Sequence, residues 1–250
     1  MPPTIRPWRL PQRPDSAFNA ALFDLDGVIT PTADVHMSAW RRTFTEYFEQ
    51  HDVTPPYSDS DYFDYVDGKP RYDGVRACLE SRGITLPDGS PDDPAGKETV
   101  CGVGNSKNDA FIAILREDGV EPYPGSVSLM DHLDRIGVPM AIVSSSRNAP
   151  EVLKAAGVAR RFDVVVDGSV TAERGLAGKP APDTYAYAAQ LLGVDGKKAV
   201  VVEDATSGVA AGAAGDFGLV VGVDRGAGEK ELMEAGADVV VKDLAELVER

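Results

Sequence analysis

The chain has 250 residues, of which 43% are hydrophobic and 26% are charged, the composition of a globular protein. Its 25 lysines and arginines are outnumbered by 40 aspartates and glutamates, so the formal net charge is −15. A negative electrostatic field repels nucleic-acid phosphates and anionic lipid surfaces, so the net charge argues against nucleic acid and membranes as partners. At this length we expect one domain with an insert, or two domains.

Residues 1–17 are rich in proline and arginine and lack the unbroken apolar stretch of a signal peptide, so we expect an extended arm. The two cysteines, Cys78 and Cys101, are too few for a disulfide scaffold and too far apart for a metal motif, which favours a reducing compartment. No apolar run approaches the roughly 20 residues that span a bilayer. We therefore expect the protein in the cytoplasm.

Short β-branched runs alternate with alanine-rich helical stretches from about residue 119 onward, and one similar run stands alone near the N-terminus. Their continuous apolar character is typical of parallel strands that are covered by helices on both faces. The expected strands are 20–23, 138–143, 164–166, 199–202, 219–223 and 239–241.

Residues 31–118 have a different sequence pattern, without β-branched runs. Trp40, Phe44, Tyr47 and Phe48 recur at helical spacing, which we interpret as a packed helix face. The proline-rich stretch 87–99 is expected to be a surface loop. The predicted fold is α/β, a doubly wound, Rossmann-like parallel sheet with an inserted helical cap. Its expected parts are the arm at 1–17, the catalytic core at 18–30 and 119–250, and the cap at 31–118.

Polar residues follow several of the expected strands, where an open parallel sheet binds its ligands. They are Asp24 and Asp26 after the first strand, 144–148 after the second, and Glu203 and Asp204 after the fourth, with Lys179 before a helix. Carboxylates so close together repel one another and raise one another's pKa, which a divalent cation relieves. Oxygen ligands without histidine or thiolate suit Mg²⁺, which also neutralises a phosphoryl group.

Each motif also has a plainer interpretation. Asp24 to Gly27 is typical of a turn at the end of a strand. The serines at 144–146 suit an ordinary loop, and Lys179 suits a solvated surface. Asn148 with Glu151 three residues later predicts a helix capping box, whatever else Asn148 does. The occurrence of all these motifs in order, each at the end of a strand or the start of a helix, favours phosphate chemistry.

Through four motifs the chain resembles the haloacid-dehalogenase superfamily of phosphotransferases over nearly all of residues 18–250. The motifs are, in order, Phe23-Asp24-Leu25-Asp26-Gly27-Val28, Ser144, Lys179 and Glu203-Asp204. The resemblance implies that Asp24 is the nucleophile that becomes an aspartyl phosphate, and that Asp26 is the general acid and base. It implies that Ser144 and Lys179 hold the transferring phosphoryl group. The implied Mg²⁺ ligands are Asp24, the carbonyl of Asp26, Glu203 and Asp204.

The insert resembles the cap of the β-phosphoglucomutase family. After Asp24 to Thr30, His36 and Trp40 follow at the spacing found in that family. The other stretches that match the family are 68–71, 107–109, 123–125 and 144–150. The resemblance implies that His36 couples substrate binding to cap closure. The residues that it implies for substrate binding are Trp40, Arg71, Lys107, Asn108, Ser145, Ser146, Arg147 and Asn148.

A mutase must hold the non-reacting phosphate of a bisphosphate, and Arg71 and Arg147 suit this task because guanidinium groups bind phosphate through paired hydrogen bonds. The plainer alternatives are that Arg71 pairs with Asp73 and that Arg147 is a solvated residue at a helix start. One position departs from the pattern. Pro31 stands where such mutases carry aspartate, at the expected hinge, and proline fixes φ and removes an N–H donor. We expect the hinge to bend at neighbouring residues.

The resemblance implies a monomeric, Mg²⁺-dependent phosphotransferase with a small sugar phosphate as substrate. It would interconvert β-D-glucose 1-phosphate and glucose 6-phosphate through an aspartyl phosphate and glucose 1,6-bisphosphate. One alternative is a sugar-phosphate phosphatase of the same fold, which would release phosphate stoichiometrically. A second alternative is a non-catalytic sugar-phosphate binding protein, against which the intact Asp24, Asp26, Lys179 and Asp204 argue.

Overall fold

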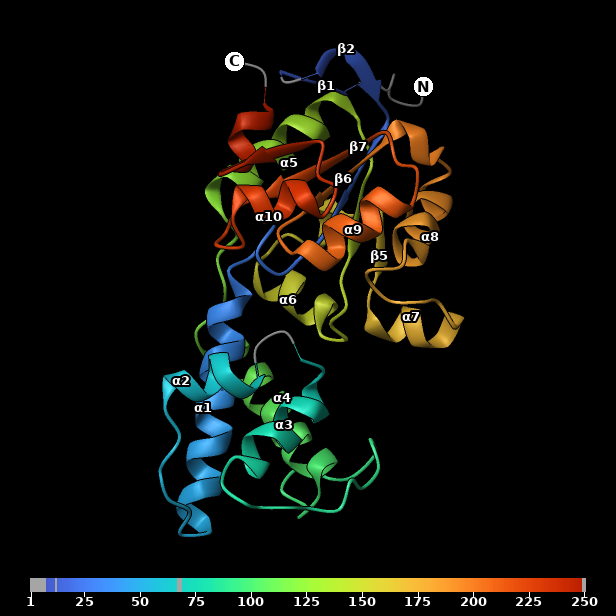
Figure 1. The fold of residues 1–250 in the computed structure, drawn as a ribbon. Coiled ribbons are helices and arrows are strands. Elements are labelled where there is room, and N and C mark those ends of the chain that lie inside the picture. The colour runs from blue at the N-terminus through green and yellow to red at the C-terminus, as the bar shows by residue number, and fades with distance from the viewer. Residues whose placement is uncertain (1–7, 12, 67–68, 249–250) are drawn as a thin grey trace. The chain divides into compact units, whose positions relative to one another are not determined.

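The computed structural model describes residues 8–11, 13–66 and 69–248. The chain divides into two compact units. The α/β unit comprises Met1–Pro31 and Val120–Arg250, and the helical unit comprises Thr32–Gly119. Figure 1 shows the helical unit in light blue to green, and the later part of the α/β unit in green to red.

The α/β unit is built on a parallel sheet of six strands in the order β5-β4-β3-β6-β7-β8. Residue Leu22 of the central strand β3 lies opposite Ala141 on one side and Val201 on the other. All side chains of β3, β4, β6 and β7 are buried, as continuous apolar strands require. The strands are β3 (Ala20–Phe23), β4 (Met140–Val143), β5 (Val164–Val166), β6 (Ala199–Glu203), β7 (Leu219–Val223) and β8 (Val239–Val241).

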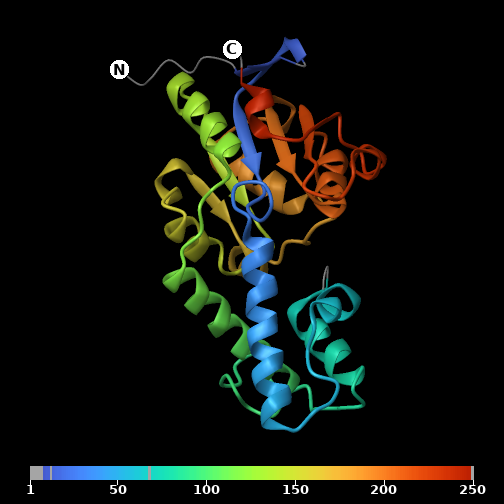
Figure 2. The same cartoon turned by 90° about the vertical axis from the view of Figure 1, so that its left-hand side faces the viewer.

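Helices cover both faces of this sheet. Helix α8 packs on β3, β4 and β5, and α9 packs on β6 and β7, while α10 packs on β7, β8 and α9. Crossovers between parallel strands are right-handed, so α5 and α6, which lead away from β3 in the other direction, cover the opposite face. Figure 2 shows α5, in green, across the sheet from the orange and red helices. The bounds are α5 (Pro124–Ile136), α6 (Ala149–Ala155), α8 (Asp183–Leu192), α9 (Thr206–Ala214) and α10 (Glu229–Glu234).

The strand order reverses between β3 and β6. The connections after β3 and β4 lead towards β5, whereas those after β6 and β7 lead towards β8. At such a switch point the loops at the carboxyl ends of the two strands diverge and leave a crevice for a ligand. Asp24 follows β3 directly and Glu203 ends β6, so both carboxylates lie at this point. The predicted doubly wound fold is confirmed.

Short elements complete the α/β unit, among them a hairpin of β1 (Trp8–Leu10) and β2 (Arg13–Phe18). Trp8 and Leu10 are fully buried, so this part of the expected arm is packed strand, while 1–7 lie outside the described residues. The strand expected at 138–143 begins at Met140, because Pro139 has no N–H for the ladder. The remaining elements are α7 (Gly168–Arg174) and the 3₁₀ turns η2 (Ala159–Arg161), η3 (Gly196–Lys198) and η4 (Leu244–Leu247).

The helical unit contains helices and no strand among its described residues. The aromatic stripe predicted from the sequence lies on α1 and is buried in the core of this unit, as expected. The proline-rich stretch 87–99 is a loop, and Thr99 caps the helix that follows it. Nowhere in the described ranges is a helix both long and apolar enough to cross a membrane. The elements are α1 (Thr32–Gln50), α2 (Asp59–Asp61), the π-helix η1 (Tyr62–Val66), α3 (Arg71–Glu80) and α4 (Val100–Glu117).

Candidate active site

Asp24 and Ser144 each come directly after a strand of the sheet. The N–H of Asp24 donates to Val202 O at 2.9 Å, and the N–H of Ser144 donates to Val166 O at 3.0 Å. Both strand ladders thus continue one residue past the strand. This fixes the main chain of the two residues at the carboxyl edge of the sheet, where Asp24 lies at the switch point and Ser144 beside it.

The chain turns sharply after Asp26. Gly27 has a φ of +85°, and its N–H donates to Thr30 O at 2.8 Å. A Cβ atom at Gly27 would lie 1.9 Å from Asp204 Oδ2. The turn therefore packs directly on the Asp204 carboxylate, and it has room for glycine alone.

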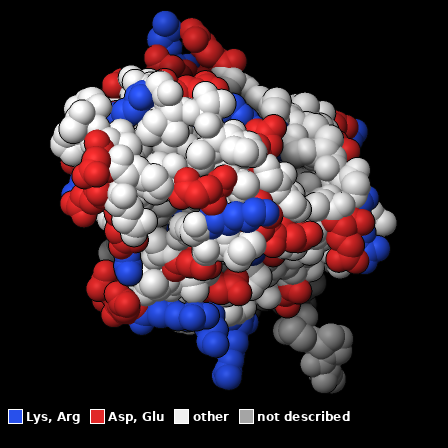
Figure 3. All heavy atoms as spheres, turned by 90° about the horizontal axis from the view of Figure 1, so that it is seen from below, with Lys and Arg blue, Asp and Glu red and all other residues white. Residues whose placement is uncertain are grey.

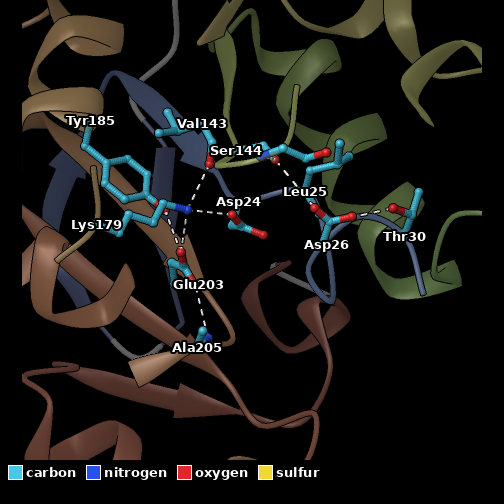
Figure 4. A network of polar contacts seen from close by, with 11 residues as sticks. Asp24, Leu25, Asp26, Thr30, Val143, Ser144, Lys179, Tyr185, Glu203 and Ala205 are labelled. Carbon is cyan, nitrogen blue, oxygen red and sulfur yellow. Dashed lines mark hydrogen bonds and ion pairs between the residues drawn. The ribbon is translucent and has the colours of Figure 1, made fainter. Parts of the chain in front are cut away.

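Lys179 joins the polar groups at the ends of three strands, as Figure 4 shows. Its Nζ atom lies 2.5 Å from Asp24 Oδ1, 2.6 Å from Glu203 Oε1 and 3.0 Å from Val143 O. The lysine side chain is only 8% exposed, and its Nζ also lies 5.0 Å from the centre of the Tyr185 ring. The plainer interpretation of Lys179 as a solvated surface lysine is therefore wrong.

Burial and like charges shift the pKa values in this cluster. Burial raises the pKa of Asp24 well above its ordinary value, and Glu203 and Asp26 add to that, while Lys179 opposes it. Burial and the neighbouring Glu203 raise the pKa of Asp204 to about 7. Burial alone would lower the pKa of Lys179, but its carboxylate partners outweigh burial and raise it, so this lysine is a cation. One lysine is too little positive charge for these carboxylates.

Three of the predicted metal ligands fit a divalent cation. Asp24, Glu203 and Asp204 each offer a carboxylate oxygen, and these atoms lie within 4.8 Å of one another. Oxygen donors with excess negative charge are what Mg²⁺ prefers. A Cβ atom at Gly208 would lie 1.6 Å from Glu203 Oε1, so a glycine of α9 makes room for this buried carboxylate.

The loop after β4 is braced by its own serines. Ser144 Oγ accepts from Ser146 N at 3.0 Å, and Ser146 Oγ accepts from Asn148 N at 3.1 Å. Ser144 Oγ also lies 3.5 Å from Asp26 Oδ2, which brings two predicted catalytic residues together. Asn148 precedes α6, but its side chain makes no capping hydrogen bond, so the predicted capping box with Glu151 is wrong. The backbone of Asn148, near φ −94° and ψ 8°, lacks the extended conformation of such caps.

A pocket of about 330 Å³ opens beside this loop in the α/β unit. Four predicted site residues line it, together with two threonines that the sequence did not single out. The Thr184 hydroxyl is buried and has no hydrogen-bond partner within the described ranges, so it is available to form a hydrogen bond with a ligand in the pocket. The polar lining consists of Ser144, Ser145, Arg147, Lys179, Thr171 and Thr184.

His36 and Lys107 form a buried pair in the helical unit. Lys107 Nζ lies 2.5 Å from His36 Nδ1, and also 5.3 Å and 4.9 Å from the rings of Trp40 and Phe111. Burial, Lys107 and Arg71 lower the pKa of His36 well below its ordinary value, so the imidazole is neutral. A lysine ammonium has donors only, so Nδ1 accepts and the ring proton lies on Nε2.

Arg71 and Asn108 meet in the same unit. Arg71 Nη2 donates to Asn108 Oδ1 at 2.8 Å. Asp73, the carboxylate considered as a plainer partner for Arg71, accepts from Arg76 at 2.7 Å. The matching stretch 68–71 begins at Gly68, which lies outside the described residues. The predicted cap residues thus form two neighbouring contacts, since Lys107 and Asn108 are adjacent on α4.

Tyr185 is a member of the site that the sequence reasoning missed. It is fully buried, and its hydroxyl donates to Glu203 Oε1 at 3.2 Å. In the sequence it is one aromatic residue in an alanine-rich helix, which is equally typical of a core position. The only available signal was its place six residues after Lys179, at the start of a helix.

Comparisons with known proteins identify relatives of this chain. A model of the haloacid dehalogenase-like hydrolase family matches residues 18–216. Beta-phosphoglucomutase of Mycobacterium tuberculosis is 48% identical over 238 residues, 92% of this chain and 91% of that protein. Hexitol phosphatase A of Escherichia coli is 30% identical over 195 residues, 77% of each chain. The solved structure of CbbY from Rhodobacter sphaeroides in complex with phosphate has a TM-score of 0.68 at 25% identity, covering 92% of this chain and 96% of that one.

Proposed function

The chain belongs to the haloacid dehalogenase-like hydrolase family and is an enzyme of phosphoryl transfer, and from this premise we propose that it interconverts β-D-glucose 1-phosphate and glucose 6-phosphate. The observation that carries the proposal is the buried contact of Lys179 with Asp24, beside a second carboxylate, Asp26, in contact with Ser144. The similarity to a named beta-phosphoglucomutase over nearly the whole of both chains supports the choice of sugar.

The proposed step begins with attack by a carboxylate oxygen of Asp24 on the phosphorus of a sugar phosphate. A new bond forms between that oxygen and phosphorus, and the bond from phosphorus to the sugar oxygen breaks. The sugar oxygen takes the electron pair of the broken bond and the proton of the Asp26 carboxyl group. In the mutase the sugar phosphate of this first step is glucose 1,6-bisphosphate, which gives its C1 phosphoryl group to Asp24 and leaves as glucose 6-phosphate. In the return step the 6-hydroxyl of β-glucose 1-phosphate gives its proton to Asp26 and takes the phosphoryl group from Asp24, which forms the bisphosphate again.

Fixed cations make this attack feasible, because a carboxylate and a phosphate repel each other. Lys179 brings a positive charge to Asp24 in a buried site, where the effective dielectric constant is low. The Ser144 hydroxyl offers the phosphoryl group a hydrogen bond. We propose that Asp24, Glu203, Asp204 and the Asp26 carbonyl hold Mg²⁺. When bound, Mg²⁺ would supply further positive charge to neutralise the phosphoryl group.

A mutase also has to keep the intermediate, glucose 1,6-bisphosphate, by its second phosphate. Arg147 lines the same pocket as Ser144 and Lys179, which supports a role for it in binding that phosphate. We propose that Ser145, Ser146 and Asn148 assist Arg147. In the helical unit we propose that Arg71 binds phosphate, that Lys107, Asn108 and Trp40 contact the sugar, and that His36 senses its presence through Lys107. The buried His36–Lys107 contact supports this last role.

The second candidate is a sugar-phosphate phosphatase with the same nucleophile. It is favoured by the similarity to hexitol phosphatase A, which spans 77% of both chains. In a phosphatase, water replaces the sugar hydroxyl in the return step, and Asp26 takes a proton from that water. The two candidates therefore differ in their product and share the first step.

The test uses β-glucose 1-phosphate with Mg²⁺ and a trace of glucose 1,6-bisphosphate, and measures glucose 6-phosphate and inorganic phosphate in parallel. We expect glucose 6-phosphate to accumulate without stoichiometric phosphate, and Asp24→Asn to abolish the reaction. The control Asp131→Asn, in an exposed carboxylate of α5, should keep it. Stoichiometric phosphate release would support the phosphatase instead. Turnover by Asp24→Asn would exclude Asp24 as the nucleophile.

A further inference from the structure

Arg225, just after β7, contacts three separate segments of the α/β unit. Its Nε donates to Gly27 O at 3.1 Å, and its Nη1 donates to Lys242 O at 3.2 Å. Its guanidinium carbon lies 3.9 Å from the centre of the Tyr123 ring, a close cation–π contact. Arg225 thereby joins the turn after Asp26 to the segments before α5 and after β8.

Arg225 is itself held by its own loop. Asp224 Oδ1 accepts from the N–H groups of Gly226 and Gly228, both at 3.0 Å, and its N–H donates to Val241 O at 2.8 Å. The hydrogen bonds to Gly226 and Gly228 lower the pKa of Asp224, which therefore stays ionised and keeps this loop closed. The guanidinium group is thus presented from a braced loop.

The partners of Arg225 are connected to one another as well. The N–H of Tyr123 donates to Ile29 O at 2.9 Å, so the Tyr123 ring and Gly27 O belong to neighbouring parts of one hydrogen-bonded structure. Gly27 follows Asp26 directly and packs against Asp204. A shift of the Gly27 carbonyl would therefore move the Asp26 main chain, and with it the Asp26 carboxyl group.

We propose that Arg225 is a positioning residue that holds the Asp26–Gly27 turn so that the Asp26 carboxyl reaches the leaving oxygen. This role rests on the proposed function, in which Asp26 gives its proton to the sugar oxygen. It predicts a dependence on the leaving group. A sugar oxygen needs that proton as its bond to phosphorus breaks, whereas the acetate of acetyl phosphate leaves as a stable anion and needs none.

The experiment compares two phosphoryl donors in the same half-reaction. Glucose 1,6-bisphosphate or acetyl phosphate is mixed with excess enzyme and Mg²⁺, and phosphoryl transfer to Asp24 is timed by intact-mass spectrometry of quenched samples. For Arg225→Met we expect the rate with the sugar donor to fall at least about tenfold more than the rate with acetyl phosphate, since general acids contribute far more than this. Arg225→Lys should restore little, because lysine lacks the planar group that stacks on Tyr123.

Two further variants separate positioning from folding. Arg174→Met is the matched control, because Arg174 also lies over a tyrosine ring, that of Tyr187 at 6.0 Å, elsewhere in the α/β unit. It should lower neither rate. Asp224→Ala loosens the loop without touching the partners of Arg225, and it should show a smaller loss with the same preference for acetyl phosphate. Circular dichroism and the melting temperature report whether each variant folds.

Equal losses with both donors in the folded Arg225 and Asp224 variants would overturn the proposal, since a merely structural role slows every phosphoryl transfer. Failure of this proposal shows in the variants, whereas failure of the proposed function shows in the unsubstituted (parent) enzyme, so the two can be distinguished. A parent that takes phosphate from neither donor contradicts Asp24 as nucleophile and this proposal with it. A parent that accepts acetyl phosphate but not the bisphosphate contradicts the mutase, and the comparison is then made with glucose 6-phosphate as the sugar donor.

Discussion

Gly27 links the backbone of the nucleophile loop to the acidic cluster. Its φ of +85° and the 1.9 Å that would separate a Cβ atom from Asp204 Oδ2 leave no space for a side chain. Gly27→Ala should therefore displace the Asp204 carboxylate and weaken Mg²⁺ binding by about tenfold or more, the usual effect of disturbing a ligand's support. Isothermal titration of the metal-free protein with Mg²⁺ measures this.

The control for that prediction is Gly175→Ala. Gly175 also has a positive φ, +64°, but a Cβ atom there would meet nothing within 4 Å. Both variants should lose about 1 kcal/mol of stability through backbone strain, while Gly175→Ala should bind Mg²⁺ like the parent. Equal Mg²⁺ affinity in the two variants would show that Gly27 does not support the metal site.

The residues of the site differ in how far the sequence could reveal them. Asp24, Lys179 and Glu203 were found because each follows a strand or precedes a helix, and such positions can be located from hydrophobic runs. Arg225 was missed because its partner Gly27 lies 198 residues away, and no local pattern indicates such a contact. The error at Asn148 has a local cause: the Ser146 hydroxyl bonds the Asn148 N–H and bends the chain away from the geometry of a cap.

At the scale of elements, a buried ion pair fastens α2 to the end of α3 in the helical unit. Arg82 donates to both carboxylate oxygens of Asp61, at 2.6 and 2.7 Å, and the two side chains are 5% and 8% exposed. Arg82 also lies over the Phe48 ring at 5.0 Å. Because an uncompensated buried charge is costly, Asp61→Asn should lower the free energy of unfolding by about 3 kcal/mol at neutral pH. Urea unfolding measures this.

The same pair predicts a pH dependence. Burial alone would raise the pKa of Asp61, but hydrogen bonds from Arg82 and Ser58 outweigh it and hold the pKa below its ordinary value. The stabilisation is therefore complete above about pH 4, the unfolded value, and is lost as pH falls through the folded value. The difference between the parent and Asp61→Asn should shrink over that range. Asp59→Asn breaks the exposed pair with Arg41 and should cost at most about 1 kcal/mol at any pH.

Elements with continuous hydrophobic runs were predictable, and the others were not. The strands β3, β5, β7 and β8 have the bounds expected from the sequence, because a strand buried on both faces must be apolar throughout. β2 was missed because Pro14, Asp15 and Ser16 interrupt any apolar pattern. The π-helix η1 was missed because its hydrogen-bond pattern has no sequence signature comparable to a heptad or an alternation.

At the scale of the whole molecule, the net charge of −15 does not describe what a substrate meets. On the face shown in Figure 3, acidic side chains lie in separate groups with lysines and arginines between them. Within the site, Lys179 is buried, and a fixed charge in such surroundings outweighs distant charges that water and salt screen. An anionic sugar phosphate can therefore bind to an anionic protein.

The chain passes between its two units twice, after Pro31 and after Gly119. Pro31 lies directly before α1, and its ring fixes φ near −65°. Gly119 has a φ of +70°, which suits glycine, and a Cβ atom there would meet nothing within 4 Å, although its N–H still donates to Leu115 O at 3.2 Å. If the units move during the reaction, the freedom that Pro31 lacks is available at Gly119.

We therefore expect Pro31→Asp to change the turnover of β-glucose 1-phosphate by less than about tenfold and to leave the ratio of isomer to released phosphate unchanged, because we expect the chain to bend at neighbouring residues. Gly119→Ala should slow turnover more than Gly83→Ala, whose glycine has nearly the same φ, +71°, and equal space, but lies inside the helical unit. Steady-state assays of both products measure these effects. A tenfold or greater change in Pro31→Asp would mean that the proline itself sets the motion, and equal effects of the two alanine substitutions would place the bending elsewhere.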